Sequence, residues 1–235
     1  MTAAGIVSEI WRYPVKSMQG ERLERATFSE LGLEGDRRWA LRDVRSGKLV
    51  SAKQNRNVLF GSARLEGEDV VMDLPDGGAN ASDWLGREVT LERADGRDAG
   101  VYEMYLDPTD ETSPLLEITT PAGTFLDAAP VHLMSRSSAG SWDPRRFRPN
   151  LLIDTAESGF PEDGWVGSAV RIGQVVLTIV MPTLRCGIPG RAQPGFESDL
   201  DVVRTLKAER QTLLGVYALV DRPGEISVGD AVEPA

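Results

Sequence analysis

The only cysteine of the chain, Cys186, is the residue whose chemistry depends most on its surroundings. It follows the apolar, mostly β-branched run 175–182, with Arg185 directly before it and Gly187 directly after it. A thiol at such a strand end is a buried small hydrophobe, a nucleophile or a metal ligand. Burial is the commonest of the three, whereas a neighbouring arginine favours the thiolate, the form that ligates metals and attacks sulfur.

The counts of histidine and cysteine limit the metal and nucleophile chemistry. With one His and one Cys, no Cys₂His₂ or Cys₄ zinc site can form within one chain, and the only Cys–His pair is Cys186 with His132. His132 lies in the predicted strand "APVHLMS", where a lone histidine more often makes a buried hydrogen bond than performs catalysis. A single cysteine also excludes an internal disulfide, so the fold does not require an oxidising compartment.

Positive charge gathers at a few places in a chain whose net charge is −10. One cluster is Arg37-Arg38, another spans residues 145–150, and Lys16-Ser17 and Arg185 are isolated members. Basic groups beside hydroxyls and loop amides suit an anionic small ligand such as a phosphate. The alternative is that these side chains cover apolar surface and pair with the 36 acidic residues. Lys16-Ser17 and Ser137-Ser138 each end a predicted strand, and strand-end loops are where binding groups accumulate.

The elements that must position these residues are mostly strands. The segment "IVSEIWRYPV" alternates apolar and polar residues with period two, which is typical of a half-buried strand. The best helix candidate is 199–210, where Leu200, Val203 and Leu206 fall at helical spacing. The polar segment 96–113, punctuated by proline and glycine, is expected to be a linker or surface loop. The pattern predicts a mainly β protein, a sandwich or a barrel with few helices.

Length and charge bound the class of protein. A chain of 235 residues is long enough for one large domain or two small ones that share a core. The net charge of −10 argues against sequence-independent binding to nucleic acid and against docking on an anionic membrane. The N-terminal residues lack the pattern of a signal peptide, and no run approaches the length of a transmembrane helix. We therefore expect a cytoplasmic protein without membrane or nucleic-acid partners.

Several segments resemble, in order, the landmarks of proteins with a MOSC (molybdenum cofactor sulfurase C-terminal) domain. Two of them resemble the N-terminal β-barrel region that precedes many MOSC domains: "YPVKS" at 13–17 and "GLEGDRRWAL" at 32–41. The others resemble the MOSC domain itself: "DAAPVHLMS" at 127–135, "RFRPNLLID" at 146–154, "RC" at 185–186, "RTL" at 204–206 and "PGEISVGDAV" at 223–232. Together they cover nearly the whole chain, and "YPVKS", "RFRPN" and "RC" in this order are the most specific part.

The resemblance implies a fold more definite than the pattern alone. We expect a mainly β protein in which a MOSC β-barrel-like domain, residues 111–235, packs with a smaller β-rich N-terminal β-barrel-like region, residues 1–110, and few helices.

The resemblance also implies a ligand. In relatives that resemble the amidoxime-reducing component of mitochondria, the molybdenum cofactor, Mo-molybdopterin, lies between the two regions, and the cysteine that matches Cys186 ligates the metal. Residues matched to the family's motifs would bind the cofactor or line its cleft: Lys16, Ser17, Arg37, Ser137, Ser138, Arg148, Asn150, Arg185 and Tyr217. A basic cleft in an acidic protein suits the cofactor's phosphate, and a thiolate suits its sulfur-rich metal.

Two functions from different classes follow. The first is a molybdenum-dependent oxidoreductase that reduces N-hydroxylated small molecules with electrons from a separate flavin or iron–sulfur protein. The second is a sulfur carrier that uses a Cys186 persulfide, or a carrier of the cofactor; a third is a scaffold that has lost the metal. We expect no pyridoxal phosphate, because the chain has no room for a desulfurase domain. The segment "GIPGRAQPGFESD" after Cys186 departs from the family's pattern and leaves the substrate open.

Overall fold

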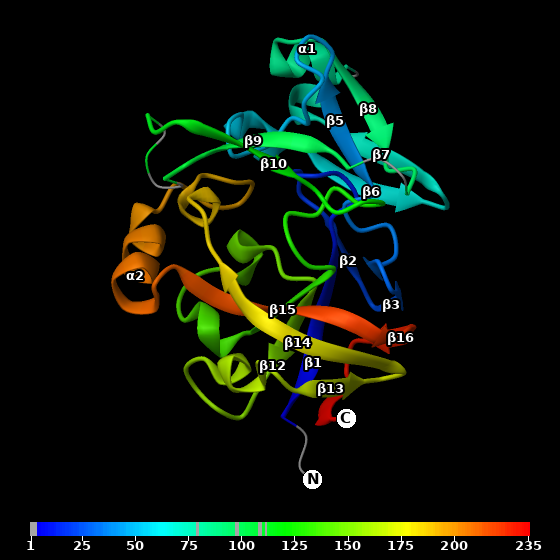
Figure 1. Ribbon diagram of the computed structural model, residues 1–235, viewed down its shortest axis with the longest axis vertical. Helices are drawn as coiled ribbons and strands as arrows, with labels where there is room; N and C mark the ends of the chain where they lie inside the picture. Colours follow the sequence, from blue (N-terminus) through cyan, green and yellow to red (C-terminus); the bar gives the residue numbers. More distant parts are fainter. Residues whose placement is uncertain (1–3, 79, 97–98, 108–109, 111) are drawn as a thin grey trace.

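A closed barrel of seven strands dominates the computed structural model, which describes residues 4–78, 80–96, 99–107, 110 and 112–235 (Figure 1). The strands follow the order β12-β11-β15-β14-β13-β17-β1, and β1 pairs with β12 to close the ring. Neighbours are antiparallel except β11 and β12. The strands are β1 (Gly5–Arg12), β11 (Val131–Ser135), β12 (Leu151–Asp154), β13 (Ala169–Ile172), β14 (Val175–Leu184), β15 (Leu213–Arg222) and β17 (Ala231–Pro234). A short strand, β2 (Glu21–Leu23), extends the sheet from β1.

Alternating apolar residues fill the barrel, because successive side chains of a strand point to opposite faces of the sheet. Val7, Ile10, Leu177 and Val216 belong to this core and are fully buried. In β11 all five residues are buried, since the outer face of this strand is covered as well. On that outer face, Met134 and Leu206 of the helix Leu200–Arg210 belong to a second apolar cluster.

The N-terminal region contributes small antiparallel sheets that stand beside the barrel, in the upper part of Figure 1. They pair β5 (Trp39–Asp43) with β8 (Val89–Arg93), β6 (Ser62–Glu66) with β7 (Asp69–Asp73), and β9 (Val101–Tyr105) with β10 (Leu115–Thr119). A three-stranded sheet joins β3 (Arg25–Ser29) to β4 (Gly32–Leu33) and to β16 (Gly224–Ser227). Val15, Met18 and Trp39 belong to the separate apolar core of this region.

The predicted fold class, mainly β with a barrel and few helices, is confirmed. The predicted helix is α2 (Leu200–Arg210), and the side chain of Asp199 caps it by accepting a hydrogen bond from the amide of Asp201. Its buried face carries Val202 and Leu206, whereas Leu200 is 57% exposed. The other α-helix of the described part is α1 (Ala81–Leu85). No helix among the described residues has both the length and the apolarity to cross a membrane.

The expectation that 96–113 is only a linker or surface loop is wrong, because β9 lies inside it and pairs with β10. This segment forms a strand because the side chain of Tyr102, which is 1% exposed, packs into an apolar cluster. The predicted division at 110/111 stays a prediction, and residue 111 lies outside the described residues. The sheet pairing crosses that division, since β1 is a strand of the barrel and β3 pairs with β16.

Candidate functional site

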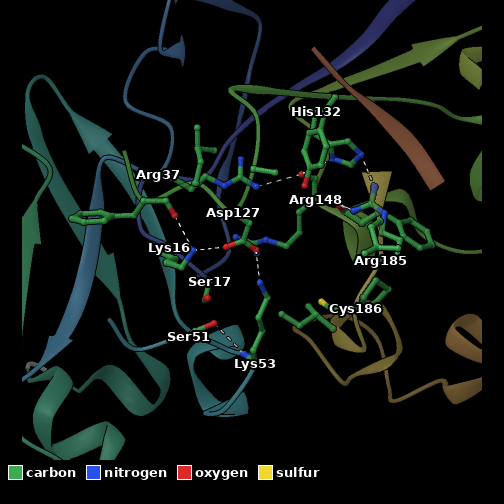
Figure 2. A pocket seen from close by; sticks show the side chains of 18 of the residues that line it. Lys16, Ser17, Arg37, Ser51, Lys53, Asp127, His132, Arg148, Arg185 and Cys186 are labelled. Atoms are coloured by element: carbon green, nitrogen blue, oxygen red, sulfur yellow. Dashed lines mark hydrogen bonds and ion pairs between the residues drawn. The ribbon is translucent and has the colours of Figure 1, made fainter. Parts of the chain in front are cut away.

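A cavity of about 130 Å³ opens where the N-terminal sheets meet the barrel. Figure 2 shows the polar side chains that converge on it from both parts of the molecule. The N-terminal part contributes Lys16, Ser17, Arg37, Ser51 and Lys53. The barrel part contributes Asp127, His132, Arg146, Arg148, Asn150, Arg185, Cys186 and Tyr217. Among the described residues, six cationic side chains thus line the cavity together with a single carboxylate.

Two of these cations share the carboxylate. The ammonium of Lys16 donates to one oxygen of Asp127 and, at 2.8 Å, to the carbonyl of Phe125. The ammonium of Lys53 donates to the other Asp127 oxygen at 2.9 Å and to the hydroxyl of Tyr102 at 3.0 Å. The ring of Tyr102 lies beneath both ammonium groups, 4.1 Å from that of Lys16 and 4.5 Å from that of Lys53. One carboxylate between two ammonium groups leaves a surplus of positive charge.

The surroundings shift the pKa values of these three groups. Burial lowers the pKa of Lys16 to about 8, although the charge of Asp127 opposes this. Burial also works against the charged form of Lys53, but the charges of Asp127 and Cys186 outweigh it and raise the pKa of this lysine. Burial likewise opposes the ionised form of Asp127, yet the two lysines hold the pKa of its carboxyl well below the usual range.

Two arginines stack on the ring of Tyr13, each with its guanidinium carbon 4.3 Å from the ring centroid. Arg37 is paired with Asp36. Arg148 donates from Nη2 to the carbonyl of Met18 at 2.6 Å, while its Nη1 atom is buried without a hydrogen-bond partner. Burial and the nearby charge of Arg37 lower the pKa of Arg148 to about 10, so it stays charged at neutral pH. A buried, charged donor with no acceptor is costly unless a ligand supplies one.

Three site residues occupy the left-handed region of backbone conformation, which side chains other than glycine rarely adopt. The φ angles are 69° at Ser17, 47° at Arg37 and 55° at Arg148. Such conformations cost of order 1 kcal/mol each and gather at binding sites. The Ser17 hydroxyl also accepts a hydrogen bond from the amide of Ala52, which ties the strand-end loop to the loop of Lys53.

Arg185 lies beside Cys186 in sequence, but its guanidinium faces the barrel wall. Nε donates to the carbonyl of Leu214 and Nη1 to that of Phe147, both at 2.9 Å, while Nη2 contacts Nε2 of His132. Burial and the charge of Arg185 lower the pKa of His132 well below its usual range, so the imidazole is neutral. Because its Nε2 accepts from Arg185, its proton lies on Nδ1, which donates to the carbonyl of Arg148 at 3.3 Å. His132 is therefore a structural residue.

Cys186 follows β14 as predicted and is partly exposed at the cavity wall. Its other side borders a smaller side pocket of about 10 Å³. The side pocket is lined by Lys53, Met104, Tyr105, Cys186, Gly187, Ile188 and Arg191. Tyr217 faces the main cavity, and burial raises the pKa of its phenol, so the hydroxyl keeps its proton at neutral pH.

The structure brings eight of the predicted site residues to the cavity: Lys16, Ser17, Arg37, Arg148, Asn150, Arg185, Cys186 and Tyr217. The amide of Asn150 is engaged in the fold, since it accepts from the amide of His132 and donates to the carbonyl of Trp11.

The expectation that Ser137 and Ser138 line the same cleft is wrong. They follow the far end of β11, and the Ser138 hydroxyl donates to the buried carboxylate of Glu162 at 2.7 Å. The Ser137 hydroxyl bonds to the carbonyl of Gly159 at 3.1 Å.

Sequence reasoning missed Lys53 and Asp127, and it placed Arg146 only as a member of the basic cluster 145–150. Asp127 opens the motif "DAAPVHLMS", and Lys53 follows the strand-like run 49–52, so a strand-end rule applied evenly would have found both. The role of Arg146 has no such signal. It donates to the carbonyls of Pro189 at 3.0 Å and Glu197 at 2.7 Å, and so fixes the segment after Cys186.

The donor set restricts which metal group could bind. Within the described ranges no three His, Cys, Asp or Glu side chains gather as ligands, so Cys186 would be a lone protein ligand. A metal held there needs its other ligands from a cofactor, and a phosphate-bearing cofactor matches the cationic lining and the unpartnered donor of Arg148.

Comparisons with known proteins identify the family of this chain. The MOSC domain family matches residues 123–233, and the MOSC N-terminal beta barrel domain family matches residues 4–112. The mitochondrial amidoxime-reducing component 1 of Homo sapiens is 26% identical over 285 residues, 97% of this chain and 82% of that protein. The mitochondrial amidoxime reducing component 2 of Bos taurus is 24% identical over 286 residues, with the same coverage. The solved YuaD protein from Bacillus subtilis is similar over 97% of this chain and 94% of its own, at 13% identity and a TM-score of 0.45, too low to support a functional statement.

Proposed function

The chain belongs to the MOSC-domain proteins that carry an N-terminal MOSC beta barrel region, as its motifs predict, and from this premise we propose that it is a molybdenum-cofactor-binding oxidoreductase. Its substrates are N-hydroxylated small molecules, and its electrons come from a separate flavin or iron–sulfur protein. The names of its relatives, amidoxime-reducing components, support this reaction class. We keep a cytoplasmic location as a prediction.

One observation carries the proposal: a partly exposed lone thiol stands at the wall of a cavity lined by six cations and one carboxylate among the described residues. In our assignment, Lys16, Ser17 and Arg37 hold the cofactor's phosphate end. Arg148 gives its unpartnered Nη1 donor to the pterin or phosphate, and Cys186 ligates molybdenum as a thiolate.

When bound, the cofactor supplies the two electrons that break an N–O bond, with two protons taken up and water released. The protein's own residues orient the substrate and supply hydrogen bonds. The phenol of Tyr217, protonated at neutral pH, is a donor toward the cavity. His132 takes no part in proton transfer, since both of its ring nitrogens are engaged by Arg148 and Arg185.

Molybdenum content tests the proposal. The wild type and Cys186→Ser are purified from a host that makes the pterin cofactor, and molybdenum per protein is measured by elemental analysis. We expect near-stoichiometric metal in the wild type, less in the variant, and reduction of an amidoxime by the wild type with an artificial electron donor. No metal in either protein, despite cofactor supply, would contradict the proposal. Mass spectrometry for a Cys186 persulfide would then test the sulfur-carrier alternative.

A further inference from the structure

Lys53 stands where the main cavity meets the side pocket. Three residues line both spaces, Lys53, Cys186 and Ile188, so Lys53 and Cys186 border the same junction between them. In Figure 2, Lys53 and Cys186 extend into the same space from different segments. The side chain of Lys53 is only 10% exposed, so water screens its electrostatic interactions less than it would at the surface.

The position of Lys53 is fixed rather than adjustable. Asp127 and the hydroxyl of Tyr102 each bind its ammonium, and the ring of Tyr102 lies beneath it. Tyr102 belongs to β9, the same strand that brings Met104 and Tyr105 to the wall of the side pocket. A charge held in this way interacts with a ligand at little cost in side-chain entropy.

The charge balance leaves Lys53 available to an anion. Asp127 is shared with Lys16, so the two ammonium groups exceed the one carboxylate by one unit of charge. On our assignment the cofactor's phosphate lies at Lys16, Ser17 and Arg37, which leaves Lys53 on the side of Cys186.

The other residues that line the side pocket determine which ligand groups fit in it. Met104 and Ile188 are apolar, and Arg191 adds a second cation whose guanidinium is bonded to the carbonyl of Ala52. A volume of about 10 Å³ admits a group of about the size of one water. One carboxylate oxygen fits this space while the rest of the ligand occupies the main cavity, whereas a positive group would be repelled by Lys53 and Arg191.

We propose that Lys53, where the main cavity meets the side pocket, forms a specificity site for the carboxylate of an N-hydroxylated substrate, so that the protein prefers anionic substrates over neutral or cationic ones. This inference rests on the proposed function for the reacting N–OH group, but the binding preference is measured without turnover.

The test is calorimetric titration of the protein, as isolated from a cofactor-producing host, with three probes. These are an aromatic amidoxime, its para-carboxylate and its para-aminomethyl analogue. We expect the carboxylate to bind about tenfold more tightly than the neutral parent, a difference of about 1.4 kcal/mol, because its charge meets the ammonium group of Lys53. The preference should shrink as salt is added.

Lys53→Met should remove the preference, and Lys48→Met is the matched control. Lys48 is also ion-paired, with Glu103 and Glu117, but it does not line either space. A second comparison, Ile188→Glu against Ile188→Gln, adds a negative charge or a neutral group of the same shape to the shared wall. We expect only the glutamate to weaken binding of the carboxylate selectively. Molybdenum content, measured for every variant, separates a change of binding from a loss of cofactor.

Equal affinity for the three probes, or a preference that survives both Lys53→Met and Ile188→Glu, would overturn the specificity site. If the carboxylate binds selectively but no amidoxime is reduced by metal-loaded protein, the specificity site stands and the proposed reaction fails. If neutral and anionic amidoximes are bound and reduced alike, the reaction stands and the specificity site fails.

Discussion

At the scale of single residues, Lys16 makes anion binding depend on pH. Burial lowers the pKa of this lysine to about 8 from 10.5, so it is charged below pH 8 and neutral above it. In cofactor-free protein, the affinity for sulfate, which remains a dianion throughout, should fall several-fold between about pH 7 and about pH 9.5. Isothermal titration at several pH values measures this.

Lys16→Arg is the control for this prediction, because an arginine keeps its charge over the same range. A sulfate affinity that falls equally in Lys16→Arg would assign the pH dependence to another group. The stability effect has the opposite sign to the binding effect. Between pH 8 and 10.5 the unfolded chain binds more protons at this residue than the folded protein does, so its contribution to stability rises with pH across that window.

How far the sequence predicts the site depends on the residue. Cys186, Lys16 and Arg148 are placed by motifs, but a strand has two ends and the sequence does not tell which end faces a ligand. Asp127 lies before β11 and lines the cavity, whereas Ser137 and Ser138 follow the other end. Five residues of strand separate the two ends by roughly 16 Å, so only one of them can reach the cavity.

At the scale of elements, Arg146 holds the segment that follows Cys186. Its guanidinium bonds three backbone carbonyls, those of Pro189, Arg191 and Glu197, and lies over the ring of Phe196. Arg146→Met leaves these carbonyls without their donor, and we expect the free energy of unfolding to fall by about 2–4 kcal/mol. Urea denaturation measures the loss, and hydrogen exchange should show faster opening of residues 187–199.

The neighbouring Arg145 provides the matched control. Its side chain is 44% exposed and is ion-paired with Asp143, so Arg145→Met should change the free energy of unfolding by only about 0.5 kcal/mol. Equal losses in the two variants would mean that the bonds of Arg146 to the segment after Cys186 do not stabilise it.

Gly215 in β15 keeps space for the contact between His132 and Arg185. Its φ is +75°, and a Cβ there would lie 2.6 Å from Nε2 of His132. Gly67 has a similar φ, +65°, but nothing within 4 Å of such a Cβ. In both alanine variants the left-handed backbone conformation should lower the free energy of unfolding by about 1–2 kcal/mol. Gly215→Ala should lower it by about 2 kcal/mol more, because the added methyl group displaces the imidazole of His132.

Urea unfolding of the two glycine variants checks this difference. Equal losses for Gly215→Ala and Gly67→Ala would show that the barrel wall accommodates the added methyl group.

At the scale of the whole molecule, β1 makes the barrel depend on the first residues of the chain. It pairs with β12 on one side and with β17 on the other, so a fragment of residues 113–235 lacks one strand of the ring. We expect this fragment to show no cooperative unfolding transition, because two open edges would expose the core. Circular dichroism during a urea titration measures this.

Restoring the strand should restore the fold. Val232 pairs with Gly5, so strand β17 lies beside the start of β1. Residues 4–24 joined after Ala235 by a short flexible linker should therefore recover a cooperative transition. A fragment that folds equally well without them would refute the role of β1.

The sequence predicts strands, but not that the first of them completes the ring. Alternation in 6–15 indicates a half-buried strand, but the local sequence does not identify β12 and β17 as its partners, because pairing over this separation is decided by the packed core. For the same reason the sequence leaves open whether the protein is a sandwich or a barrel.

The closure by β1 also has a consequence for biosynthesis. During synthesis β1 must wait for a partner far along the chain, because it pairs with β17, Ala231–Pro234. The small N-terminal sheets have an apolar core of their own and can form early, but the ring that contains β14, the strand before Cys186, closes only after β17 has been synthesised. The ring that borders the cavity is therefore completed late in synthesis, and a chain that ends before residue 231 lacks the strand that joins β13 to β1.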